Sequence, residues 1–216
     1  MEYISLQERI LTECKDQAKE YLVKKGTCGL IGFFSVLSSD EAEKMVDFFK
    51  TGNKSNSLDP LLCVIPLVLK NGKNFETDKV ISALKHVCPD ISEHALIDGL
   101  ILFSFIFDLF YGVNINDALE NINSLNEDCK KKFNIIPFHK LNLSSISSLK
   151  TDFKSIIVVK DFVESEELSN NQFFNYTDSV SKAIILFIRD SSRESNNNLE
   201  VEKKYGDAIK SFLLSI

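Results

Sequence analysis

The fold of this chain depends on one apolar stretch, Ala95 to Val113, which reads ALIDGLILFSFIFDLFYGV. The stretch is apolar on nearly every side of a helix, which is typical of a helix at the centre of a bundle. It is nearly long enough to span a membrane, but Asp98 and Asp108 would be expensive at the depth of a bilayer. We therefore predict a buried central helix, capped by Ser92 or Asp90 and ending at Gly112, and no membrane partner.

The two aspartates of this helix need an explanation of their own. A carboxylate on an apolar helix costs free energy unless it is paired or hydrogen-bonded. Asp98 and Asp108 are ten residues apart, which is close to three helical turns, so we expect them on one face. We interpret that face as the side of the helix that meets solvent or a partner, and a polar binding site is the alternative.

Helical patterns continue on both sides of the central stretch. A capping box, Ser38 with Glu41, precedes one helix, and Asp59 followed by Pro60 begins another, which Pro66 should kink or end early. Apolar spacing predicts helices at residues 5–25, 39–49, 61–70, 77–87, from 114, 126–132, 179–189 and 199–216. The predicted fold class is all-α: a single compact orthogonal bundle of about eight helices, one domain over residues 1–216.

Two segments do not fit the helical pattern at first sight. Gly26, Gly29 and Gly32 follow the first helix, so Gly26 is predicted to end it and the three glycines to form a turn. A phosphate-cradling loop is the alternative, but no strand precedes the glycines and no Lys-Ser/Thr follows them. The run SIIVVK at residues 155–160 has strand composition without a partner strand, so we interpret it as extended or helical packing.

Composition restricts the partners and the compartment. The net charge of -6 opposes attraction to phosphate backbones, so general nucleic-acid binding is not indicated. The five cysteines are odd in number and never spaced as CxxC, which argues against a zinc site and a disulfide framework. The first residues lack the basic start and apolar run of a signal peptide, and we expect a cytoplasmic protein without a cofactor.

Several segments occur in an order that resembles a known family. The segments are SLDPLLCVIPL at residues 57–67, ALKH at 83–86, NDAL at 116–119 after the central helix, DSVSKAIILFIR at 178–189 and YGDAIKSFLLSI at 205–216. Together they resemble the ADP-ribosylglycohydrolases, over roughly residues 26–216. The resemblance implies an all-α, ADP-ribosylglycohydrolase-like bundle.

The resemblance also implies which functional residues are missing. Members of that family hold two magnesium ions with a T-D-D-T motif and a D-x-D-T motif, and neither occurs in this sequence. Cys63 stands where the family has a ligand-binding arginine. Asn56, Asp59 and His86 fall at or near other ligand-binding positions, so they are the candidate residues of a vestigial ligand site. The resemblance thus implies no catalytic residues and no metal ligands.

Two other sites can be built from residue types alone. Cys88 and His86 are a nucleophile and a base, but residues two apart on a helix point in different directions. The histidines at 86 and 94, with Cys88, Asp90 and Glu93, have ligand types that suit zinc, but their spacing matches no tetrahedral pattern. A solvated corner between two helices is the favoured interpretation.

Three functional hypotheses follow. The preferred one is a non-catalytic ADP-ribosylglycohydrolase-like protein, a pseudoenzyme that acts as a binding or regulatory factor on a macromolecular partner, most simply a protein. ADP-ribose is a second candidate ligand. The alternatives are an active ADP-ribosyl hydrolase with an atypical site, and an all-α interaction module unrelated to that family.

Overall fold

The computed structural model describes residues 6–70, 76–135, 137–138, 140–165, 178–193 and 198–216, with side chains from residue 17 onward. Every regular element in these ranges is helical, so the predicted all-α fold class is confirmed. The elements are α1 (Leu6–Phe34), α2 (Ser39–Thr51), η1 (Pro60–Cys63), α3 (Val64–Lys70), α4 (Thr77–Val87), α5 (Glu93–Phe110), α6 (Ile115–Phe133), η2 (Ile146–Ser148), α7 (Lys154–Ser165), α9 (Ser179–Ser191) and α10 (Leu199–Leu214).

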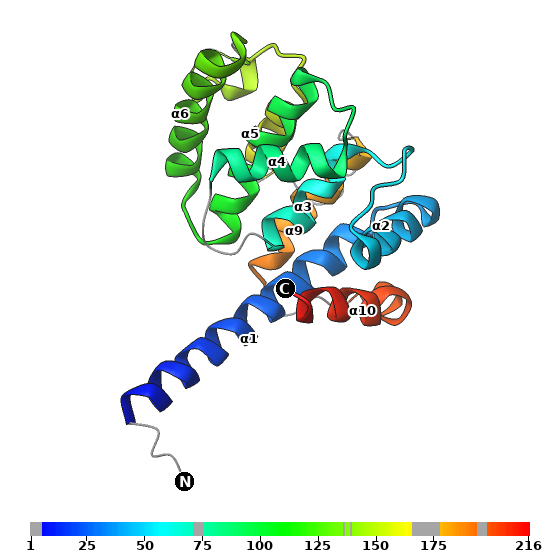
Figure 1. Ribbon diagram of the computed structural model, residues 1–216. Helices are drawn as coiled ribbons and strands as arrows, with labels where there is room; N and C mark the ends of the chain where they lie inside the picture. Colours follow the sequence, from blue (N-terminus) through cyan, green and yellow to red (C-terminus); the bar gives the residue numbers. More distant parts are fainter. Residues whose placement is uncertain (1–5, 71–75, 136, 139, 166–177, 194–197) are drawn as a thin grey trace.

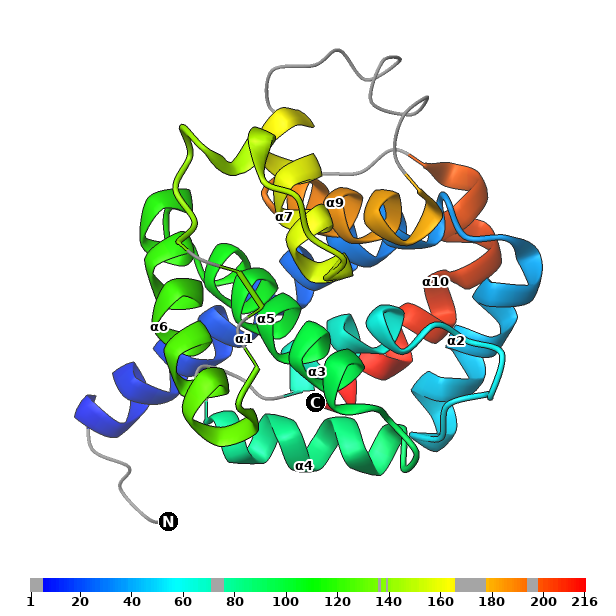
Figure 2. The same ribbon diagram turned by 90° about the horizontal axis from the view of Figure 1, so that it is seen from above.

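The helix α5 forms the centre, as its composition predicts. All residues from Leu96 to Asp108 are buried, and α3, α4, α6 and α7 pack around the helix (Figures 1 and 2). Ser92, rather than Asp90, is the N-cap, and its side chain accepts a hydrogen bond from the Ala95 amide. Among the residues described, no helix has the length and apolarity needed to cross a membrane.

The predicted end of the first helix at Gly26 is wrong. The helix α1 continues through all three glycines to Phe34 and makes its most extensive contact with α9. A Cβ at Gly29 would lie 2.8 Å from the Phe187 ring and 2.9 Å from that residue's carbonyl oxygen, and a Cβ at Gly32 would lie 2.3 Å from an Asp190 carboxylate oxygen. The glycines therefore allow α9 to approach closely, and with no loop there the phosphate-cradling alternative is also wrong.

The two aspartates of α5 are buried and lie against different helices. The Asp98 carboxylate accepts hydrogen bonds from the backbone amide and the hydroxyl of Ser155, at 2.8 and 2.6 Å, at the start of α7. Asp108 accepts one from the Asn121 side chain of α6, at 3.0 Å. The expectation of one shared solvent face is therefore wrong, because ten residues fall short of three turns by roughly 80°. Each carboxylate joins the central helix to a different neighbour.

Other local predictions have mixed outcomes. The SIIVVK run belongs to α7, so of the two readings the helical one is correct. Residues 115–133 form one helix rather than two. Pro66 neither kinks nor ends a helix, because the segment begins as the 3₁₀ turn η1 and Pro66 falls in the first turn of α3. In a first turn the missing N–H of proline removes no helical hydrogen bond.

Candidate functional site

The structure places the three residues of the predicted ligand site in different roles. Asn56 lines a hollow of about 390 Å³. Asp59 is the N-cap of η1, where its carboxylate accepts a hydrogen bond from the Leu61 amide at 2.9 Å. His86 is exposed on the last turn of α4. Of the three residues, only Asn56 belongs to the wall of this hollow.

This hollow, called here the Asn56 hollow, lies between the chain before η1 and the turn that joins α4 to α5. Its walls are Lys54, Asn56, Pro60, Val87, Cys88, Pro89, Asp90, Ile91, Ser92 and Ala95. The Lys54 ammonium is already used, because it donates to the carbonyl oxygens of Ser55 and Leu58 at 2.9 and 3.0 Å. The wall of the hollow therefore mixes polar and apolar residues, and its one lysine is already hydrogen-bonded to backbone carbonyl oxygens.

The chemistry of the nearby thiols is unfavourable for nucleophilic catalysis. Burial is the main cause that raises the pKa of Cys88 above its ordinary value, and Asp59 raises it further while Lys54 lowers it. Burial also raises the pKa of Cys63, which lies nearby. A thiol must lose its proton to act as a nucleophile. Both cysteines are therefore held as neutral thiols near pH 7.

His94, one of the histidines considered for zinc, contacts the chain just before α7 and Asp98 of its own helix. Its ring stacks on Phe153, with 4.0 Å between ring centroids. Its two nitrogens lie 3.6 Å from an Asp98 carboxylate oxygen and 3.7 Å from one of Asp152. Among the residues described, no three His, Cys, Asp or Glu side chains gather closely enough to hold a metal ion.

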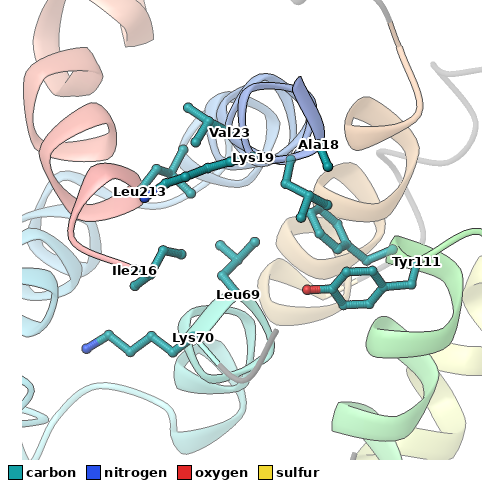
Figure 3. A pocket seen from close by; sticks show the side chains of 10 residues that line it. Ala18, Lys19, Val23, Leu69, Lys70, Tyr111, Leu213 and Ile216 are labelled. Atoms are coloured by element: carbon teal, nitrogen blue, oxygen red, sulfur yellow. The ribbon is translucent and has the colours of Figure 1, made fainter. Parts of the chain in front are cut away.

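A second pocket, which is apolar, lies on another side of the molecule (Figure 3). It measures about 320 Å³ and is called here the α1–α10 pocket. Its lining comes from α1, α3, the end of α5 and the C-terminal residues: Ala18, Lys19, Leu22, Val23, Leu69, Lys70, Phe110, Tyr111, Leu213 and Ile216. Figure 3 shows Leu69 and the Tyr111 hydroxyl pointing toward its interior.

The charged groups of this pocket are cationic. Lys19 and Lys70 belong to the lining, which contains no aspartate or glutamate. Close by, the Lys25 ammonium donates to the Phe110 carbonyl oxygen and lies 5.0 Å from the centre of that ring. Burial lowers the pKa of Lys25 and raises the pKa of Tyr111. The Tyr111 hydroxyl therefore stays neutral, as a donor and acceptor inside an apolar wall.

Sequence reasoning did not find this pocket. The only signals were the amphipathic pattern of the first helix, with Ala18 and Leu22, and the apolar end of the chain. These segments are almost two hundred residues apart in the sequence, and they meet because α10 packs against α1. The pocket is a product of that packing.

Comparisons with known proteins provide no relative for this chain: no protein-family model, curated protein or solved structure matches it. The resemblance to the ADP-ribosylglycohydrolases therefore stays a prediction. The assignment of Asn56, Asp59 and His86 to a ligand site also stays a prediction.

Proposed function

We propose that this chain is a non-catalytic binding or regulatory factor that docks a protein partner in the α1–α10 pocket. The observation that carries the proposal is the pocket itself, a concave apolar surface of about 320 Å³ assembled from α1, α3, α5 and α10 together with Tyr111 and Ile216. Concave apolar sites with a few polar groups are typical of binding sites. Lys19, Lys70 and Tyr111 supply those polar groups.

The position of the pocket favours a macromolecular partner. It lies where the first part of α1, residues 6–21 and called here the free part, leaves the bundle, and the free part stands clear of the other helices in Figure 1. The side chains from Gln17 to Tyr21 are all exposed. A partner seated in the pocket can therefore also contact the part of α1 before Ala18, which lies outside the lining and which a small ligand would not reach.

The buried walls of the pocket make it suited to hold an apolar side chain. Phe110, Leu213 and Leu69 are only 1%, 2% and 7% exposed. A leucine-sized side chain that enters such a site and loses its contact with water contributes about 2 kcal/mol. A few such side chains are enough for a specific interaction, because most binding energy in interfaces comes from a small number of central residues.

A blocked pocket tests the proposal. Ala18 is exposed at the edge of the pocket, so Ala18→Trp should fill the pocket without disturbing the core. Glu20→Trp places the same side chain on the same helix at an exposed position that is not part of the lining. A photo-crosslinker at Lys19 should trap the partner in the otherwise unchanged protein and in the Glu20→Trp variant, but not in the Ala18→Trp variant. Equal crosslinking in both variants would contradict docking in this pocket.

A second candidate function is ADP-ribose binding in the Asn56 hollow. Asn56, which the family resemblance implies as a ligand-binding residue, lies in the wall of this hollow. The volume of about 390 Å³ is suitable for part of a nucleotide. Isothermal titration with ADP-ribose, with and without magnesium, tests it, with Asn56→Ala as the variant. Magnesium-dependent binding would support the hydrolase alternative. If no heat of binding is measured in either condition, ADP-ribose binding is excluded and protein binding is the remaining proposal.

A further inference from the structure

Three lysines lie in or beside the α1–α10 pocket: Lys19, Lys25 and Lys70. In the described ranges, Lys44, Lys79, Lys131, Lys132, Lys140 and Lys154 are in ion pairs with carboxylates. Among the side chains described, from residue 17 onward, no ion pair involves Lys19, Lys25 or Lys70. Lys25 contacts the ring and the carbonyl oxygen of Phe110, and Lys70 contacts the Phe212 ring. The lining of the pocket thus contains two lysines and no aspartate or glutamate, on a chain whose net charge is -6.

Two of these lysines are placed to meet a ligand at the edge of the pocket. The Lys70 ammonium lies 5.5 Å from the centre of the Phe212 ring of α10. In Figure 3, Lys19 reaches from α1 toward Leu213, so that Lys19 and Lys70 border the side of the pocket near α10. Lys25 is half-buried and already held by Phe110. The two lysines at the edge are therefore the available partners for carboxylates.

The pocket and the free part of α1 together match one known way of recognising a peptide. An amphipathic helix can lie in an apolar groove with side chains at i, i+3, i+4 and i+7 as anchors. The free part of α1 gives such a helix a neighbour to lie beside, and the pocket takes its largest apolar side chains. Carboxylates on the flanks of the helix would then reach Lys19 and Lys70.

We propose that the partner segment is an acidic amphipathic helix, which inserts apolar side chains into the α1–α10 pocket and places carboxylates against Lys19 and Lys70. This inference rests on the proposed function, since it concerns the same pocket. It adds the chemistry of the partner: apolar on one face and acidic on the flanks. Ion pairs at the edge of an interface act mainly on association rate and salt dependence, so binding should weaken as salt rises.

The experiment uses two designed helical peptides of 18 residues as probes, labelled with fluorescein. Both carry the same leucine face, and the polar positions are glutamate in one peptide and lysine in the other. Fluorescence anisotropy with the full chain should show binding of the glutamate peptide at least about tenfold tighter than the lysine peptide at low salt, and a smaller ratio at 0.5 M sodium chloride.

Variants connect the preference to the two lysines. In the double variant Lys19→Glu/Lys70→Glu the preference should reverse in favour of the lysine peptide. Lys85→Glu/Lys130→Glu is the matched control, because it makes the same change in net charge at two exposed positions outside the pocket. The control should keep the preference of the unchanged protein.

The possible results separate this inference from the proposed function. Equal binding of the two peptides, abolished by Ala18→Trp, would overturn the acidic partner but keep the pocket as a docking site. Binding that Ala18→Trp does not affect would overturn both. If vesicles of phosphatidylglycerol bind through Lys19 and Lys70 while neither peptide binds, the surface is a lipid site and the inference is wrong.

Discussion

The two ends of α1 differ in how closely they pack against other helices. The packed part, residues 26–34, presents glycines to α9 and is almost entirely buried. The free part, residues 6–21, leaves the bundle (Figure 1), and its described side chains, from Gln17 to Tyr21, are all exposed. One helix thus serves as a core element at one end and as part of a binding surface at the other.

The difference shows how poorly glycine content reflects local structure. A glycine in a helix costs up to about 1 kcal/mol relative to alanine, so three within seven residues would normally end the helix. Here the close approach of α9 offsets that cost, because an alanine in the same place would collide with Phe187 or Asp190. The free part has better helix-forming residues, but its described side chains, from Gln17 to Tyr21, are not buried by a neighbour.

The largest expected effect is on the packed part. Gly29→Ala should lower the free energy of unfolding by about 2 kcal/mol, since the added Cβ meets the Phe187 ring and backbone and the overpacking outweighs the gain in helix propensity. Urea unfolding followed by circular dichroism measures the change. Gly206→Ala in α10 is the control, because its Cβ meets only Glu202 at 3.5 Å, and it should stabilise by up to about 1 kcal/mol.

A smaller effect is expected where the two parts of α1 meet. A Cβ at Gly26 would lie 2.9 Å from the end of the flexible Leu213 side chain, which can move. The gain in helix propensity should nearly cancel the repacking, so Gly26→Ala is expected to change the stability by less than about 1 kcal/mol. A loss as large as that of Gly29→Ala would mean that the rigid contact extends to Gly26.

The pH dependence of the contact between α7 and α9 gives a third test, because α9 is the helix against which the packed part of α1 lies most extensively. Burial, followed by repulsion from Asp178 and Glu164, raises the pKa of Asp161 on α7 from 3.8 to about 6. The folded state therefore binds this proton more tightly than the unfolded state, and Asp161 costs stability as the pH rises from 3.8 to 6. Asp161→Asn should raise the melting temperature at pH 7.5, and the gain should vanish near pH 4. A gain of equal size at both pH values would contradict the assignment.

The smallest effect on stability is expected in the free part. Tyr21 is 64% exposed, so Tyr21→Ala should change the free energy of unfolding by no more than about 0.5 kcal/mol. The same urea experiment measures it. A loss above 1 kcal/mol would show that the free part is packed in solution, against a second copy or another part of the chain, and would remove the contrast between the two ends.

Local signals were enough to predict most of the helices. The capping box of Ser38 and Glu41 forms at the start of α2 as predicted. The bounds of α4, Thr77–Val87, are those that the apolar spacing gives, and the breakers around Gly112 end α5 where expected. Each of these features depends on hydrogen bonds and side-chain spacing within a few residues, which are written in the sequence.

The sequence alone determined the fold class, the central position of α5 and the starts of most helices, because these follow from local hydrogen bonding and apolar periodicity. Only the tertiary structure decided that the glycines of α1 are a packing surface, that Asp98 and Asp108 join α5 to different helices, and that Lys19 and Lys70 border one pocket with Leu213. These features depend on distances between residues far apart in the chain, and a single sequence does not contain those distances.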